Sequence, residues 1–254
     1  MREFLEMCGG FVRLGLRSLG CIVPCKKDDV WIHLEEMIAD AWHIVMITCF
    51  FTGGVLAMQS ADAFIDINMS QATLFIPRIV TKSMLLELGP VFTALILAGR
   101  SGAGIAAQIS SMNVSRQVHA LRALAIDPVV FLVTPRVYAM LLGLPMLVIL
   151  ADLAGVFGGL LYCAGKLQMT AAVFLKEAAD TVYLKDILGS LLKTLVWGGL
   201  IAVMGALHGL RARGGIVGVG QATRDTVVHS MILILISDFF LTRIFRIVLS
   251  YFIG

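Results

Sequence analysis

Charged residues are scarce in this chain. Asp, Glu, Lys and Arg make up 15% of its 254 residues, whereas soluble domains carry about 25%. Ala, Val, Ile, Leu, Met, Phe, Trp, Tyr and Cys account for 59%, and the mean hydropathy is +0.92. A soluble globule of this size cannot bury so much apolar side chain and still cover its surface with polar groups. The composition therefore excludes a soluble domain and predicts an all-α integral membrane protein.

The usual signatures of catalysis and of metal binding are also missing. The sequence has no GxxxxGK[ST] phosphate-binding loop, no GxSxG and no HExxH, and its five histidines are scattered. The five cysteines form no CxxC pair and have no histidine nearby at metal-ligand spacing. With 20 Lys and Arg against 17 Asp and Glu, the charge balance is too even to suggest nucleic acid. We expect no catalytic residue, no bound cofactor and no metal site in this chain.

Five stretches are long and apolar enough to cross a membrane, which takes about 20 residues. They cover residues 41–61, 73–99, 137–165, 187–210 and 226–253. The second is the weakest by hydropathy, because Arg78, Lys82 and Glu87 interrupt it. Inside the third and fourth, GxxxG spacings at Gly155/Gly159 and Gly205/Gly209 indicate close helix packing.

Lys and Arg are concentrated in the segments on one side of these spans. Five precede residue 41, four lie between the second and third spans, and three lie between the fourth and fifth. Cytoplasmic segments of membrane proteins carry an excess of Lys and Arg, so the N-terminus is predicted to be cytoplasmic. A short helix over residues 170–183 is then expected on the outer face.

The segment before the first span is predicted to lie at the membrane surface. Apolar residues such as Phe4, Phe11 and Leu16 share one helical face, and Arg13 and Arg17 lie on another. This pattern favours an amphipathic helix in the cytoplasmic interface, with a soluble partner-binding helix as the alternative. A second short helix, 31–40, should lead into the first span. The predicted division is thus an interfacial segment, 1–40, and a five-span domain, 41–254.

The most informative charge within a span is Glu87. With Arg100 at the cytoplasmic edge, Glu87 lies about 19 Å along the helix axis, a little beyond the bilayer centre. A carboxyl at that depth is costly unless it meets a partner, a water-filled cavity or a proton. Pro90 lacks the N–H that would bond the carbonyl of Leu86, so a kink or a free carbonyl is expected there. Lys82 lies about 140° around the helix from Glu87, so the two cannot readily pair on one helix but could face a shared cavity or a second subunit.

A structural role is the alternative for each of these buried acids. For Glu87 that alternative is a carboxyl held by neighbouring helices. For Asp152 and Asp238, in the third and fifth spans, a structural role is the favoured interpretation.

A second candidate site lies between the second and third spans. Ser115 is expected to cap a helix over residues 116–126, which Asp127 and Pro128 end. Its apolar face contains Val118, Leu121, Leu124 and Ala125, and its polar residues are Arg116, Gln117, His119 and Arg122. A short amphipathic helix on the cytoplasmic side suits docking into a groove on another protein. An interfacial helix resting on lipid is the alternative.

Three segments carry a family resemblance: LLELGPVFTALILAGRSGAGIAAQISSM, QVHALRALAIDPVVFLVTPR and GVGQATRDTVVHSMILILISDFFLT. They closely resemble the permease subunits of MCE-type ABC transporters, the MlaE/YrbE family. The resemblance implies an interfacial elbow helix and five spans in a homodimer of the inner membrane. It also implies an ABC ATPase subunit that binds ATP and Mg, a ring of MCE-domain proteins, and phospholipid or another lipid as the transported molecule.

The resemblance further implies roles for the two candidate sites. The lipid cavity would involve Glu87, Lys82, Leu86, Gly89 and Pro90. The helix that couples to the ATPase would involve Arg116, Gln117, Val118, Leu121, Arg122, Leu124 and Asp127. The chain departs from the family pattern at Gln108 and Arg116, where the family usually has Glu, so contacts of those acids with the ATPase are in question.

Two other functions are compatible with the residues alone. A proton-coupled secondary lipid transporter would use Glu87 or Asp238 as its coupling site, although no inverted repeat is visible in the five spans. A non-transporting scaffold would anchor envelope proteins and would not need Glu87 or Lys82 for lipid movement.

Overall fold

The structure is a computed structural model that describes residues 10–11, 13–15, 17–18, 27–66 and 70–253. All regular structure within those ranges is helical, without any strand. The helices long and apolar enough to cross a membrane are Asp29–Asp66, Thr73–Val114, Val129–Lys166, Leu184–Arg211 and Gly215–Phe245. The prediction of an all-α membrane protein with five spans is confirmed. The first four helices extend beyond the predicted spans, and the fifth begins earlier.

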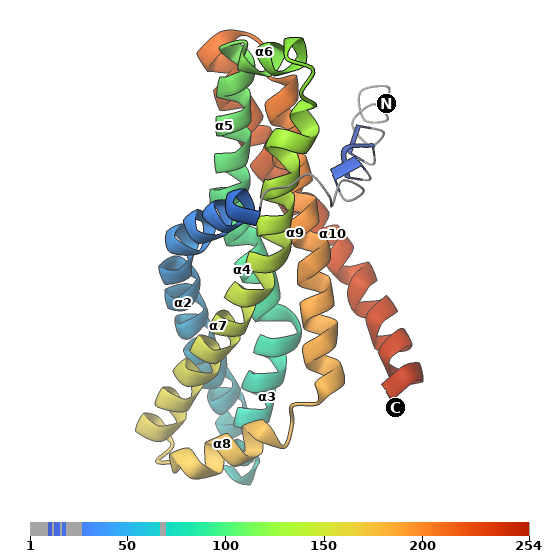
Figure 1. Ribbon diagram of the computed structural model, residues 1–254. Coiled ribbons are helices and arrows are strands. Elements are labelled where there is room, and N and C mark those ends of the chain that lie inside the picture. Colours follow the sequence, from blue (N-terminus) through green and yellow to red (C-terminus); the bar gives the residue numbers. More distant parts are fainter. Residues whose placement is uncertain (1–9, 12, 16, 19–26, 67–69, 254) are drawn as a thin grey trace. The chain divides into compact units, whose positions relative to one another are not determined.

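The elements follow one another as helices joined by short turns (Figure 1). They are α2 (Lys27–Asp66), α3 (Ile76–Ser83), α4 (Gly89–Leu97), α5 (Ala103–Val114), α6 (Gln117–Ala123), α7 (Thr134–Lys166), α8 (Ala171–Ala179), α9 (Leu184–Arg211) and α10 (Gly215–Ile253). A 3₁₀ helix at Ser70–Phe75 precedes α3, and π-helical turns occur at Met84–Leu88, Ala98–Gly102 and Val129–Val133. The predicted helix over 170–183 is present as α8.

The segment before the first span differs from the prediction in one respect. The separate helix expected over 31–40 is instead the first part of α2, which runs without a break from Lys27 to Asp66. No Pro or Gly occurs in this helix before Gly53, so nothing in the sequence interrupts it. Of the predicted amphipathic helix, residues 10–11, 13–15 and 17–18 are helical, and the rest lies outside the described residues. Arg17 pairs with Asp127, with 3.1 Å between Nη2 and Oδ2.

The second span changes its winding next to Pro90. Because Pro90 has no N–H, the carbonyl of Leu86 receives no backbone hydrogen bond from it. The preceding turn, Met84–Leu88, is π-helical, and the Gly89 N–H donates to the carbonyl of Met84, five residues back. The expected kink is therefore a widened turn at Glu87.

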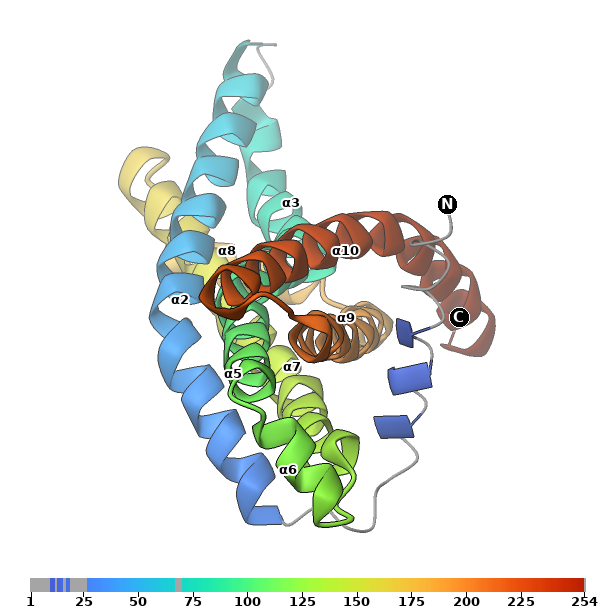
Figure 2. The same ribbon diagram turned by 90° about the horizontal axis from the view of Figure 1, so that it is seen from above.

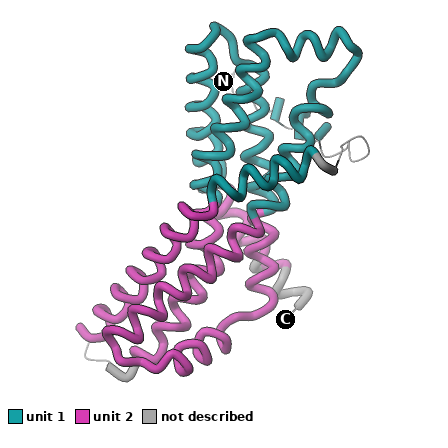
Figure 3. Tube along the Cα trace, turned by 60° about the vertical axis from the view of Figure 1, so that its left-hand side comes forward, with its two compact units in different colours: residues 1–41, 94–144, 195–236 teal, residues 42–93, 145–194, 237–254 magenta. Residues whose placement is uncertain are grey.

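Proximity between Cα atoms divides the chain into two compact units, which Figure 3 shows in different colours. Unit 1 comprises residues 1–41, 94–144 and 195–236, and unit 2 comprises 42–93, 145–194 and 237–254. The boundaries fall within α2, α4, α7, α9 and α10, so each of these helices contributes to both units. The division predicted from the sequence separates an interfacial segment, 1–40, from a five-span domain, 41–254. Proximity between Cα atoms does not address that division, which stays a prediction.

Glycines allow close packing of helices inside each unit, as the GxxxG spacings predicted. In unit 2, a Cβ on Gly53 of α2 would overlap the carbonyl of Gly155 on α7. In unit 1, α5 and α9 run side by side (Figures 1 and 2), and a Cβ on Gly209 would lie 2.8 Å from Cβ of Ile109. The core of unit 1 also holds Trp197, which is fully buried.

Candidate functional site

A buried lysine on α9 organises a polar cluster in unit 2. Nζ of Lys193 lies 3.0 Å from Oε2 of Glu87 and 3.1 Å from Oδ1 of Asp238. The same ammonium donates to the hydroxyl oxygen of Thr242 at 2.8 Å and to the carbonyl of Leu86 at 2.9 Å. Its three N–H bonds are thus shared among at least these four acceptors. These contacts join the widened turn of the second span to α9 and α10.

Each element contributes to the cluster for a local reason. Asp238 and Thr242 are four residues apart on α10, so they project from the same face of that helix. The hydroxyl of Thr242 donates to Oε1 of Glu87 at 3.1 Å. The carbonyl of Leu86, which Pro90 leaves without its backbone donor, instead accepts from Lys193. The free carbonyl expected from the sequence is therefore satisfied by a side chain.

The cluster contains one buried cation and two partly exposed carboxylates. The side chain of Lys193 is 4% exposed, whereas that of Glu87 is 39% exposed. A buried ammonium is tolerated only when it is paired and hydrogen-bonded, and Lys193 meets both conditions. The exposed part of Glu87 reaches the adjoining cavity, so the carboxyl both pairs with Lys193 and is available to a ligand.

This cavity has a volume of about 410 Å³ and lies within unit 2. Its charged lining residues are Lys82, Glu87, Lys185, Asp186 and Lys193. Lys82 and Glu87 both line this cavity, and no ion pair joins them in the described part of the chain. Nζ of Lys82 instead lies 3.8 Å from Oδ2 of Asp186 and 5.5 Å from the ring centre of Tyr183.

The structure separates the residues predicted to form the cavity into two groups. Lys82, Leu86 and Glu87 line it. Gly89 and Pro90 are buried and lie outside the lining set, and a Cβ on Gly89 would overlap Oδ1 of Asp152. Their contribution is to helix packing and to the widened turn, and any role in lipid binding stays a prediction.

The remaining acids within the spans have different environments. Asp238 belongs to the Lys193 cluster, so it lies at the candidate site as well as having a structural partner. Asp152 is placed beside Gly89, and its buried Oδ1 has no hydrogen-bond partner in the described part of the chain. Sequence reasoning missed Lys193 as a site residue, although it is the only charged residue between 187 and 210.

The second candidate site, between the second and third spans, is a helix shorter than predicted. The expected helix was 116–126, and α6 covers Gln117–Ala123. Ser115 does not cap it: its hydroxyl donates to the carbonyl of Met112, and Arg116 occupies the N-cap position with a left-handed φ of 62°. The helix ends early because Ala125 also has a left-handed φ, of 59°.

The apolar face of α6 borders a shallow groove in unit 1. The groove includes Val118, Leu121 and Leu124, together with Phe131 and Leu132 from the start of the third span. Val118 is buried, whereas Leu124 and Phe131 are largely exposed. Arg116, Gln117 and Arg122 are exposed as well. The α6 surface thus presents apolar side chains within a polar rim.

Asp127 has a different role from the helix stop that was predicted. Its Oδ1 accepts a hydrogen bond from the N–H of Val129 at 3.0 Å, at the start of the third span. Its Oδ2 pairs with Arg17. Asp127 therefore connects the segment after α6 to the N-terminal helix.

Comparison with known proteins identifies the family. A polytopic helical chain with a charged cluster inside its spans has the character of a membrane permease. The family model described as Permease MlaE matches residues 30–244. The chain belongs to this permease family.

Relatives occur in several organisms. The chain is 40% identical to a probable ABC transporter permease protein of Rickettsia typhi over 247 residues, which cover 95% of this chain and 93% of that protein. It is 40% identical to a probable ABC transporter permease protein of Synechocystis over 78% of this chain and 74% of that protein. It is 31% identical to the chloroplastic protein TRIGALACTOSYLDIACYLGLYCEROL 1 of Arabidopsis thaliana, over 84% of this chain and 60% of that protein.

Proposed function

We propose that this chain is the membrane subunit of an ABC transporter that moves phospholipid or a related lipid across or between envelope membranes. The observation that carries the proposal is the cavity in unit 2, where Glu87 and Lys82 are accessible beside the buried Lys193. Its volume falls within the ~300–1,000 Å³ typical of small-molecule sites. Such a space accommodates a lipid headgroup, while exposed apolar side chains such as Phe239 on α10 suit contact with acyl chains.

The charges that line the cavity match the chemistry of a phospholipid headgroup. The ammonium groups of Lys82 and Lys185 are donors for phosphate oxygens. Glu87 and Asp186 are acceptors for an ammonium or hydroxyl of the headgroup. A ligand that carries both a phosphate and an ammonium or hydroxyl group can bind the lysines and the carboxylates at the same time.

The energy for transport comes, in this proposal, from ATP hydrolysis by a separate ABC ATPase. The chain supplies no catalytic group, and ATP with Mg is bound by that partner. The ATPase docks on α6, where Leu121 and Leu124 offer an apolar contact inside a rim formed by Arg116, Gln117 and Arg122. The assembly is a homodimer in the inner membrane with a cytoplasmic N-terminus and a ring of MCE-domain proteins on the outer side.

Reconstitution of the purified assembly tests this function. The chain is co-purified with its neighbours, and any retained lipid is identified by mass spectrometry. Transfer of a labelled phospholipid from proteoliposomes to acceptor vesicles is then measured with ATP, without ATP, and with an ATPase partner that lacks its phosphate-loop lysine. Transfer that requires ATP and the intact ATPase supports the proposal.

Two results would replace the proposal with its alternatives. Transfer driven by a proton gradient in the absence of the ATPase would make the chain a secondary transporter. If lipid transfer by the assembly is unchanged when Glu87 and Lys82 are both replaced by Gln, the chain acts as a non-transporting scaffold.

A further inference from the structure

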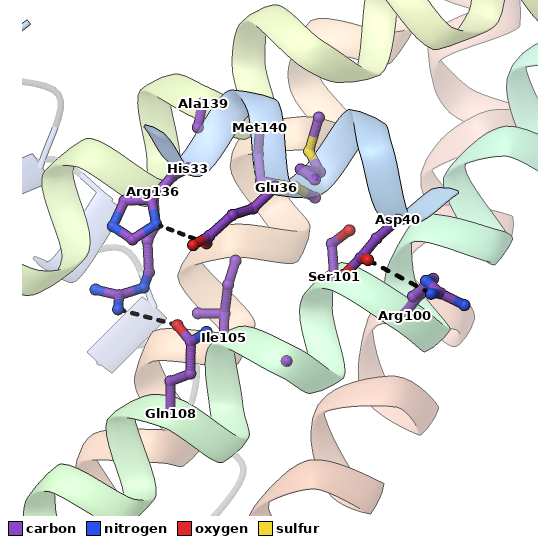
Figure 4. A pocket seen from close by; sticks show the side chains of 12 residues that line it. His33, Glu36, Asp40, Arg100, Ser101, Ile105, Gln108, Arg136, Ala139 and Met140 are labelled. Atoms are coloured by element: carbon purple, nitrogen blue, oxygen red, sulfur yellow. Dashed lines mark hydrogen bonds and ion pairs between the residues drawn. The ribbon is translucent and has the colours of Figure 1, made fainter. Parts of the chain in front are cut away.

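A second polar pocket lies within unit 1, away from the Lys193 cluster in the sequence (Figure 4). It has a cavity volume of about 90 Å³ and is enclosed by the first part of α2, by residues 100–108 of the second span, and by α7. Its charged and polar lining residues are His33, Glu36, Asp40, Arg100, Gln108 and Arg136. None of them is used by the proposed transport site.

Arg136 on α7 is buried in this pocket, and no carboxylate of the described chain is in direct contact with it. The residue is 6% exposed. Its guanidinium donates to the carbonyl of Leu132 through Nη1 and to Oε1 of Gln108 at 3.0 Å through Nη2. Both acceptors are neutral, and Nε has no partner among the described residues. No carboxylate of the described chain forms an ion pair with Arg136. A guanidinium stays charged at every pH that proteins tolerate, and within the described chain only the longer-range attraction of Glu36 offsets the charge of Arg136.

The other ionisable groups of the pocket have close partners of their own. Nη2 of Arg100 lies 3.6 Å from Oδ1 of Asp40, and Nδ1 of His33 lies 3.5 Å from Oε2 of Glu36 (Figure 4). The side chain of Glu36 is 60% exposed, so it carries its own hydration. Arg136 is therefore the cation of this pocket whose guanidinium touches no carboxylate, and an anion in the cavity would supply that contact.

The mouth of the pocket is placed at the depth of lipid headgroups. Glu36, Asp40 and Arg100 are exposed on helices that cross the membrane, and exposed charges are strongly disfavoured in the hydrocarbon core. Trp31, two residues before His33, is also exposed, and Trp is enriched at membrane–water interfaces. An anion that is abundant at this depth is the phosphate of a phospholipid.

We propose that this pocket binds the phosphate group of a membrane phospholipid headgroup, with Arg136 as the buried cation. The guanidinium of Arg136 lines the cavity, and its planar N–H groups suit phosphate oxygens. Arg100 at the mouth adds a second donor. Inorganic phosphate offers the same oxygens, so the test distinguishes the two sources. The site would hold a resident lipid whether or not the chain transports one.

Binding to defined micelles tests the site without any transport assay. The delipidated full chain is titrated in detergent with palmitoyl-oleoyl phosphatidylglycerol, and bound lipid is counted by native mass spectrometry. Gln108→Glu places a carboxylate beside Arg136 and so supplies a direct contact from within the chain. This variant should weaken lipid binding about tenfold, because one charge-assisted hydrogen bond to the lipid is lost. Because Gln108 is exposed, this variant keeps the core intact.

Control variants show whether the effect of Gln108→Glu depends on its position or only on the added negative charge. Ser111→Glu adds the same charge one helical turn away at another exposed position and should bind as the wild type does. Glu36→Gln removes a nearby acid and should bind at least as tightly. Diacylglycerol with the same chains should not occupy the site. Wild-type lipid binding in Gln108→Glu would overturn the proposal. Displacement of the lipid by millimolar inorganic phosphate would overturn the headgroup as the occupant.

Discussion

Nζ of Lys193 lies 3.0 Å from Oε2 of Glu87, although 106 residues separate them in the chain. The sequence is compatible with two roles for Glu87: a carboxyl in a ligand cavity and a carboxyl paired within the helix bundle. The geometry combines them, because one oxygen faces Lys193 while the side chain still lines the cavity. Lys193 fixes the position of Glu87, so variants of the two residues should have different consequences.

Replacing Lys193 by Met should destabilise the chain. The substitution leaves Glu87, Asp238 and the carbonyl of Leu86 without their shared donor. Removing one partner of a buried ion pair costs about 3–5 kcal/mol. Thermal unfolding in detergent should show a clear drop in the midpoint. Lys185→Met removes a half-buried charge from the same cavity and should cost less than about 1 kcal/mol. Equal midpoints for the two variants would contradict the role given to Lys193.

Close packing in unit 2 makes a second prediction. Gly53→Val would drive Cβ into the carbonyl of Gly155, and overpacking of this kind costs about 1–3 kcal/mol or more. The variant should therefore unfold at lower temperature. Gly165→Val is the control on α7, because no atom lies within 4 Å of its added Cβ. An unchanged midpoint for Gly53→Val would show that α2 and α7 do not pack at these glycines.

Local sequence features predicted much of this fold. Apolar length located all five spans, and the GxxxG spacings marked helix contacts that the structure contains. The missing N–H of Pro90 correctly pointed to the carbonyl of Leu86. Each of these features depends on residues close together in the chain, so the sequence alone was sufficient.

Features that depend on distant parts of the chain were missed. Lys193 was noted only as the single charge in its span, because its partners lie on the second and fifth spans. The cap at Ser115 was wrong for a local reason: Arg116 adopts a left-handed conformation, and the hydroxyl of Ser115 turns back to Met112. Arg136 gave no signal either, since its burial and its neutral neighbours follow from tertiary packing.

The orientation of the chain can be checked by labelling. In a background without native cysteines, a Cys that replaces Lys176 on α8 should react with an impermeant reagent from outside. A Cys that replaces Arg213, between α9 and α10, should react only after permeabilisation. Both positions are exposed, so access to the reagent depends on the side of the membrane. The reverse labelling pattern would place α6 on the outer side and exclude it as the ATPase contact.

Docking of the ATPase is tested at Leu121. Leu121→Asp puts a charge into the apolar groove beside α6, and it should abolish co-purification of the ATPase while the permease remains inserted. Arg116→Glu alters an exposed rim charge and should do less, since such charges act mainly on association rate and specificity. The measurement is the ATPase recovered per permease, together with the size of the permease in detergent. Full ATPase recovery with Leu121→Asp would remove α6 from the interface.

The last prediction concerns Glu87 itself. Glu87→Gln keeps one oxygen that accepts from Lys193 and gains an NH2 that can donate to the hydroxyl of Thr242, but it removes the negative charge that faces the cavity. It should lower lipid transfer about tenfold, the value of one charge-assisted contact, with normal abundance in the membrane. Glu87→Leu loses the contact to Lys193 as well, so both transfer and abundance should fall.

Three measurements on the same preparations separate the two contributions of Glu87. Abundance reports the hydrogen-bonded contact with Lys193, lipid transfer reports the charge in the cavity, and ATP hydrolysis by the assembly reports the separate contact at α6. Hydrolysis should persist in Glu87→Gln, because the substitution leaves the groove beside α6 intact. Equal loss of abundance and transfer in Glu87→Gln would make the carboxyl purely structural. Normal transfer at normal abundance in Glu87→Leu would exclude both contributions, because neither the pair with Lys193 nor the charge in the cavity would then matter.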